Sequence, residues 1–162
     1  MKKLTVLALM FGFIMVCGTA FAEDVTVTYT IPSVATITKV GDPAEITLAG
    51  TTAGAFDEVT ETFSVDVAYN GSAEYKITAD INSAIGTGAT MTLLASTCPI
   101  GTASAVRTLC TGATDNGAQD MVTDLANDAD TIVFTVGLTA TMAASTASSA
   151  TKTITLTLTS ES

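Results

Sequence analysis

Residues 132–142 have the sequence IVFTVGLTATM, and this stretch decides the fold class. Every second position is apolar or small: Ile132, Phe134, Val136, Leu138, Ala140 and Met142. A period of two is what a half-buried β-strand requires, because successive side chains of a strand point to opposite faces. The stretch therefore predicts a long strand with one face in a hydrophobic core.

The same alternation recurs through most of the chain. Short runs of it begin near Val25, Val34, Thr62, Tyr75 and Met91, and the last one spans 151–159. No segment has the spacing of an amphipathic helix, and the abundant Thr, Val and Ile suit a pleated, half-buried surface. Eight to ten short strands of this kind predict an all-β fold, an Ig-like β-sandwich, with a closed barrel as the alternative.

Two details of this sandwich are expected from local patterns. A two-residue turn after the run that begins at Thr62 would place Val67 opposite Glu74 and bury a charge. A hairpin with a three-residue loop, 70–72, instead sets Val67 beside Tyr75. Residues 103–130 are less regular, and we expect loops there with one short strand or a turn of helix.

The beginning of the chain has the pattern of an export signal. Residues 2–3 are lysines, residues 4–17 are apolar, and a small-x-small motif ends at Ala22. The apolar run is shorter than the ~20 residues of a spanning helix, so cleavage is favoured over anchoring. The sequence predicts a signal peptide, 1–22, export by the general secretory route and a mature chain that begins near Glu23.

The composition argues against several classes of function. Removal of two lysines with the signal peptide leaves four basic and sixteen acidic residues, a net charge of −12. Such a chain repels nucleic acid and anionic membrane surfaces, so neither is an expected partner. The chain has no His and no Trp, and no nucleophile–base pair or phosphate-binding loop is apparent. We therefore expect no catalytic residues, no cofactor and no enzymatic activity.

Acidic residues gather in two places. Asp57, Glu58 and Glu61 lie where a loop meets a strand, and solvated charges are expected at such positions. The second group could supply oxygen ligands to Ca²⁺, but its spacing does not match a known calcium loop. A solvated acidic loop is the main expectation and a weak calcium site the alternative for these three residues: Asp124, Asp128 and Asp130.

Cys98 and Cys110 are the two cysteines that remain after removal of the signal peptide. An even pair in an exported chain predicts a disulfide, here one that closes a loop of about a dozen residues. The alternative is two reduced, buried thiols.

A candidate for polymer formation follows the cleavage site. Residues 25–31, with the sequence VTVTYTI, alternate cleanly until Pro32, which cannot donate a hydrogen bond to a ladder. Such a segment can leave its own domain, 34–162, and complete the sheet of a neighbouring copy, which gives a head-to-tail filament. The alternative is an ordinary first strand of a self-contained sandwich. The side chains expected to dock are Val25, Val27, Tyr29 and Ile31.

The start, 25–32, and the Thr-rich final strand, 152–159, resemble those of chaperone–usher pilins, and the layout is similar to the major pilins of class 5 fimbriae. The resemblance implies that 23–33 is a donor-strand segment. It also implies that the final strand is an edge that a periplasmic chaperone caps before assembly. That strand would present these side chains at the acceptor edge: Ile154, Leu156 and Leu158.

The expected function is therefore that of a secreted structural subunit of a surface fibre, whose partners are copies of itself. The fibre would serve adhesion or a biofilm matrix. The alternative is a monomeric, secreted Ig-like module that binds a carbohydrate or a surface protein.

Overall fold

The structure is a computed structural model that describes residues 30–48, 56–141 and 151–161. These residues form ten β-strands and no helix. The strands are β1 (Val34–Lys39), β2 (Val59–Asn70), β3 (Tyr75–Ile81), β4 (Ala89–Thr97), β5 (Thr102–Ala103), β6 (Arg107–Thr111), β7 (Thr114–Asp115), β8 (Gln119–Thr123), β9 (Asp128–Ala140) and β10 (Ile154–Ser160). The chain divides into two units, Met1–Ile31 and Pro32–Ser162, and all ten strands belong to the second.

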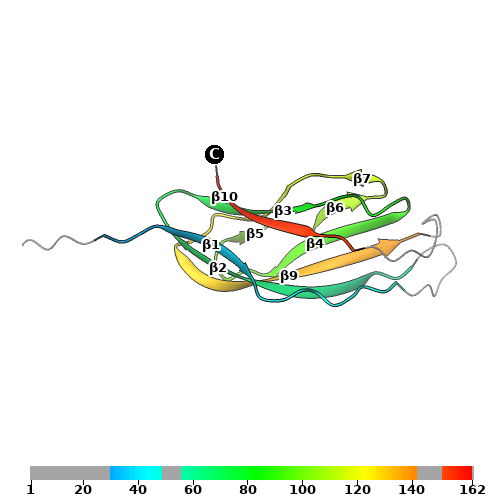
Figure 1. The fold of residues 1–162 in the computed structure, drawn as a ribbon, viewed down its shortest axis with the longest axis horizontal. Coiled ribbons are helices and arrows are strands. Elements are labelled where there is room, and N and C mark those ends of the chain that lie inside the picture. The colour runs from blue at the N-terminus through cyan, green and yellow to red at the C-terminus, as the bar shows by residue number, and fades with distance from the viewer. Residues whose placement is uncertain (1–29, 49–55, 142–150, 162) are drawn as a thin grey trace, which may run out of the picture. The chain divides into compact units, whose positions relative to one another are not determined.

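The ten strands make two antiparallel sheets (Figure 1). The first sheet has the order β1-β2-β9-β4-β6-β7 and the second the order β10-β3-β8-β5. The all-β prediction is therefore confirmed. The arrangement is that of two separate sheets rather than one closed sheet, and it is consistent with a β-sandwich.

The two sheets share one hydrophobic core, which their alternating apolar residues supply. In β9, Ile132 and Phe134 are completely buried, and the ring of Phe134 stacks on Phe63 of β2 with centroids 5.5 Å apart. On β3, Ile77 and Ala79 are equally buried. These alternating runs were readable from the sequence because each strand packs only one face against the core.

The predicted hairpin between β2 and β3 is wrong, because the two strands lie in different sheets. Both edges of β2 are occupied, one by β1 and the other by β9, so β3 has no place beside it. The chain instead crosses to the second sheet through residues 71–74. The hydroxyl of Tyr69 donates to the carbonyl of Ala73, and the rings of Tyr69 and Tyr75 lie 4.7 Å apart across this corner.

Residues 103–130 are more regular than their sequence indicates, since they include β6, β7 and β8, the last residue of β5 and the start of β9. Both β6 and β8 bury two consecutive side chains rather than alternate ones: Leu109 and Cys110, and Met121 and Val122. The ladders that hold β6 and β8 contain register shifts. Such irregularities break the period of two and hide the strands from a pattern search.

The predicted disulfide does not form, and Cys98 and Cys110 are both free thiols. Cys110 lies opposite Met91 in the β4–β6 ladder, whereas Cys98 follows the far end of β4, seven residues further on. At about 3.3 Å per residue this separates the two cysteines by roughly 20 Å, and a disulfide needs Cα atoms within about 7 Å. The alternative of two reduced thiols describes the structure, with Cys110 buried and Cys98 half-buried.

Candidate functional site

The two sheets end differently on their two sides. On one side the edge strands are β5 and β7, of two residues each. On the other side they are β1 and β10, of six and seven residues, and these two strands approach each other (Figure 1). Proteins shorten their edge strands because unpaired edges recruit other strands. We call residues 34–39 and 154–160 the open edge.

Strand β10 has none of the usual protection of an edge. Its sequence, ITLTLTS, contains no charge, no proline and no glycine, and its ladder with β3 has no register shift. Within the described part of the chain it pairs on one side only, with β3. A straight, uncharged edge of seven residues is a template for main-chain pairing with another strand.

Burial decreases from β3 to β10 across the second sheet. Ile81 of β3 is 2% exposed and pairs with Ile154, which is only half-buried. Leu156 and Leu158, opposite the fully buried Ala79 and Ile77, are also half-buried although they pack against the same core. The inner face of β10 is therefore apolar but incompletely covered.

Strand β1 does not fully cover the inner face of β10. Val67 of β2 is 1% exposed, but its partner Ile37 on β1 is half-buried. The neighbours of Ile37 on the same face, Ala35 and Lys39, are exposed. The inner face of β1 thus contributes only one half-buried apolar side chain, and the inner side chains of β1 and β10 are less buried than their partners on β2 and β3.

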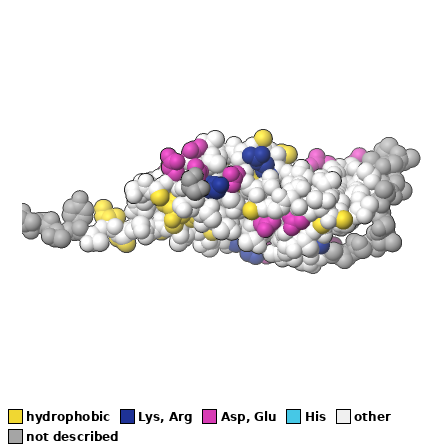
Figure 2. Space-filling model, turned by 90° about the horizontal axis from the view of Figure 1, so that it is seen from above, with side chains coloured by type: hydrophobic (Ala, Val, Ile, Leu, Met, Phe, Trp, Pro, Cys, Tyr) yellow, Lys and Arg dark blue, Asp and Glu magenta, His cyan; other side chains and the backbone are white. Residues whose placement is uncertain are grey.

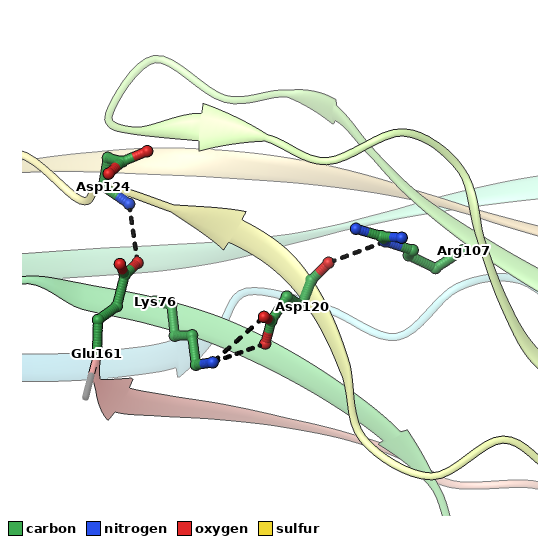
Figure 3. Close-up of polar contacts among 5 residues, drawn as sticks. All are labelled: Lys76, Arg107, Asp120, Asp124 and Glu161. Carbon is green, nitrogen blue, oxygen red and sulfur yellow. Dashed lines mark hydrogen bonds and ion pairs between the residues drawn. The ribbon is translucent and has the colours of Figure 1, made fainter.

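Hydrogen bonds fix both ends of β10. At its end, the amide of Glu161 donates to the carbonyl of Glu74 (2.7 Å), and the Glu161 carboxylate accepts from the amide of Asp124 (3.1 Å; Figure 3). At its start, Asn82 and Thr153 exchange two hydrogen bonds of 3.0 and 3.1 Å. The strand is held in register on β3, and on its other edge it pairs with no strand of the described residues.

Charged side chains link strands within the second sheet and across to the first sheet. Lys76 of β3 bridges both oxygens of Asp120 on β8 (3.0 and 3.2 Å), and Arg107 donates to the main-chain carbonyl of Asp120 (Figure 3). Exposed pairs of this kind contribute about 0–1 kcal/mol. Figure 2 shows one face of the molecule, on which acidic and basic side chains lie near each other among small, separated hydrophobic patches.

Asp124, Asp128 and Asp130 do not come together as a group of metal ligands, and the described residues contain no group of three or more acidic, His or Cys side chains that could hold a metal. Asp128 and Asp130 each accept a hydrogen bond from the amide of the next residue, at 2.8 and 2.7 Å. Asp124 accepts from the hydroxyl of Thr123. The three carboxylates thus make separate local hydrogen bonds, two of them within β9.

Of the predicted donor residues, Val25, Val27 and Tyr29 lie outside the described residues. Ile31 is described and its side chain is 68% exposed. The acceptor residues Ile154, Leu156 and Leu158 lie on β10, the edge strand of its sheet. The interaction of Glu161 with Asp124 had no signal in the sequence, because these residues are 37 positions apart.

Comparisons with protein-family models, curated proteins and solved structures found no match to this chain. Among the described residues, no helix is long and apolar enough to cross a membrane.

Proposed function

We propose that this protein is a secreted structural subunit of a surface fibre, built by donor-strand exchange between copies of an Ig-like sandwich. Residues 25–31 of one copy add to β10 of the next. The observation that carries the proposal is strand β10 of the open edge. It lacks the usual protection of an edge strand, and its inner side chains are only half-buried.

The proposed donor and acceptor match in length and chemistry. Residues 25–31 and β10 have seven residues each, carry no charge and alternate threonine with larger apolar side chains. Paired side by side, the two strands place apolar side chains together on the inner face and threonines together on the outer face. Main-chain hydrogen bonds then supply affinity and the apolar side chains supply register.

The stabilisation available at such a junction is large. Burial of four apolar side chains, Val25, Val27, Tyr29 and Ile31, contributes on the order of 6–10 kcal/mol before the cost of ordering. Fixing the backbone and side chains of the donor segment removes part of this gain. The remainder is enough to hold copies together, and adhesion or a biofilm matrix is the role that such a fibre serves. No catalytic step is part of the proposal.

The test compares the mature chain, 23–162, with two variants. One variant lacks residues 23–31. The other keeps their length but replaces Val25, Val27 and Tyr29 by threonine. We expect the mature chain to form filaments and SDS-resistant ladders, and both variants to stay monomeric with a cooperative urea transition that shows an intact sandwich. A mature chain that remains a monomer, with the amides of residues 25–31 protected from exchange, would instead support the self-contained binding module.

A further inference from the structure

The two strands of the open edge differ in their inner faces, because β1 carries a charge there and β10 carries none. Lys39, the last residue of β1, lies directly opposite the buried Val65 of β2. Residues opposite each other on paired strands point to the same face of a sheet, so the Lys39 side chain leaves the strand on the core side. The core side of β10 instead presents Ile154, Leu156 and Leu158.

An ion pair keeps the ammonium group of Lys39 in water. Its Nζ lies 2.6 Å from Oδ1 of Asp42, and the two side chains are 61% and 76% exposed. So exposed a pair adds little to the stability of the fold. A strand added beside β1 would cover the Lys39 side chain, and removal of a charge from water is costly. Inward-pointing charges are one of the means by which edge strands avoid pairing with other chains.

The main chain alone does not distinguish the two strands. The amide of Val40 donates to the carbonyl of Ser64 (3.0 Å), and bonded residues alternate along an antiparallel ladder. Ile37 therefore turns its N–H and C=O groups away from β2. The hydrogen bonds to β3 at both ends of β10 give Leu156 and Leu158 the same orientation, away from β3. The choice between the two edges thus falls to their side chains.

We propose that Lys39 determines which strand of the open edge accepts another copy of the chain: it prevents strand addition at β1 and leaves β10 as the acceptor. Both strands belong to the same unit, Pro32–Ser162. The inference rests on the proposed donor-strand exchange and adds to it the choice of the acceptor edge. Without the charge, the alternating residues 34–38 are open to edge-to-edge pairing with a second copy.

The test replaces Lys39 by valine in the mature chain, 23–162. Valine suits a strand and removes the charge from the inner face. One control, Lys39→Arg, keeps the charge. The other, Thr38→Val, adds the same valine to the exposed outer face of β1. For each protein, sedimentation measures association over a range of concentrations, and mass spectrometry measures amide exchange in peptides that cover β1 and β10. Urea unfolding reports whether the sandwich is intact.

We expect the β1 amides of Lys39→Val to exchange at least tenfold more slowly at high concentration than in the dilute monomer. In the wild type and both controls we expect β1 to exchange at the monomer rate throughout, while exchange of β10 slows in the polymer.

Unchanged β1 exchange in Lys39→Val overturns the role of Lys39 and leaves the fibre proposal intact. Slowed β1 exchange in the wild type or in Thr38→Val overturns that role as well. A wild type whose β10 exchange never slows overturns the fibre proposal, and β1 exchange in Lys39→Val still decides whether the lysine blocks that edge.

Discussion

At the scale of single residues, two glycines with nearly the same positive φ differ in the space around them. Gly101 has φ +111° and Gly86 has φ +108°. A Cβ atom on Gly101 would lie 2.8 Å from the carbonyl oxygen of Thr123, whereas a Cβ on Gly86 meets nothing within 4 Å. Alanine at either position is strained by a φ that L residues rarely adopt, at a cost of about 1–3 kcal/mol.

We expect Gly101→Ala to lower the free energy of unfolding by about 1–3 kcal/mol more than Gly86→Ala, because only Gly101 adds a collision with main-chain atoms. Urea unfolding of the two variants measures the difference. Equal losses would mean that the loop before β5 moves to accept the methyl group.

The free thiols make a second prediction at this scale. Burial raises the pKa of the Cys98 thiol above its ordinary value. The reactive thiolate therefore forms at higher pH in the folded protein than in the unfolded chain. We expect iodoacetamide to alkylate Cys98 with a midpoint at higher pH when the protein is folded.

We also expect reductant to leave the urea midpoint unchanged. A downward shift of that midpoint with reductant would indicate a disulfide.

At the scale of elements, the sequence was informative where a strand has one buried face and a regular ladder. In β9 the alternation alone identified Ile132, Phe134 and Val136 as core residues, and all three are buried. It failed for β6 and β8, where bulges place consecutive side chains in the core. The predicted β2–β3 hairpin was also wrong, because the residues of a turn carry no information on whether distant strands occupy both edges of β2.

The candidate site was also predictable from the sequence only in part. The apolar alternation of β10 is visible in the sequence. The incomplete burial of its inner side chains is not visible, because it depends on how little of them β1 covers. Whether two cysteines meet likewise depends on register, and the register of β4 against β6 places Cys110 opposite Met91.

The two faces of β10 give a matched pair of variants. Leu156 lies on the inner face and is half-buried, and Thr157 is exposed on the outer face. A lysine at position 156 puts a charge where an added strand would bury it, and burial of an unpaired charge is costly. We expect Leu156→Lys to slow polymerisation by at least about tenfold, a difference of ~1.4 kcal/mol.

Thr157→Lys is the control, and its charge stays in water, so it is expected to polymerise at nearly the rate of the wild type. Urea midpoints report how much each lysine disturbs β10 in the monomer. Inhibition of equal size by both variants would show that the inner face of β10 has no special part in assembly.

At the scale of the whole molecule, two segments of one chain match each other. The sandwich ends in long, uncharged β10, and the segment before Pro32 has the same length and the same alternation. A contact between one end of a molecule and a different surface of the next is head-to-tail and does not close, so it generates a filament rather than a dimer. The distances between subunits in that filament are the quantity to measure.

The most direct measurement is disulfide trapping between two copies, in a background where Cys98 and Cys110 are serine. One set of variants carries a cysteine at position 26, 28 or 30 of the donor segment, and the other at position 155, 157 or 159 of β10. Outward-facing neighbours on paired strands have Cβ atoms about 5 Å apart, near the range that a disulfide spans.

Mixed copies from the two sets are predicted to form intermolecular disulfides in filaments for one register of pairs and not for the others. Absence of cross-linking in all nine combinations, or cross-linking only within single chains that carry both cysteines, would contradict donor-strand exchange.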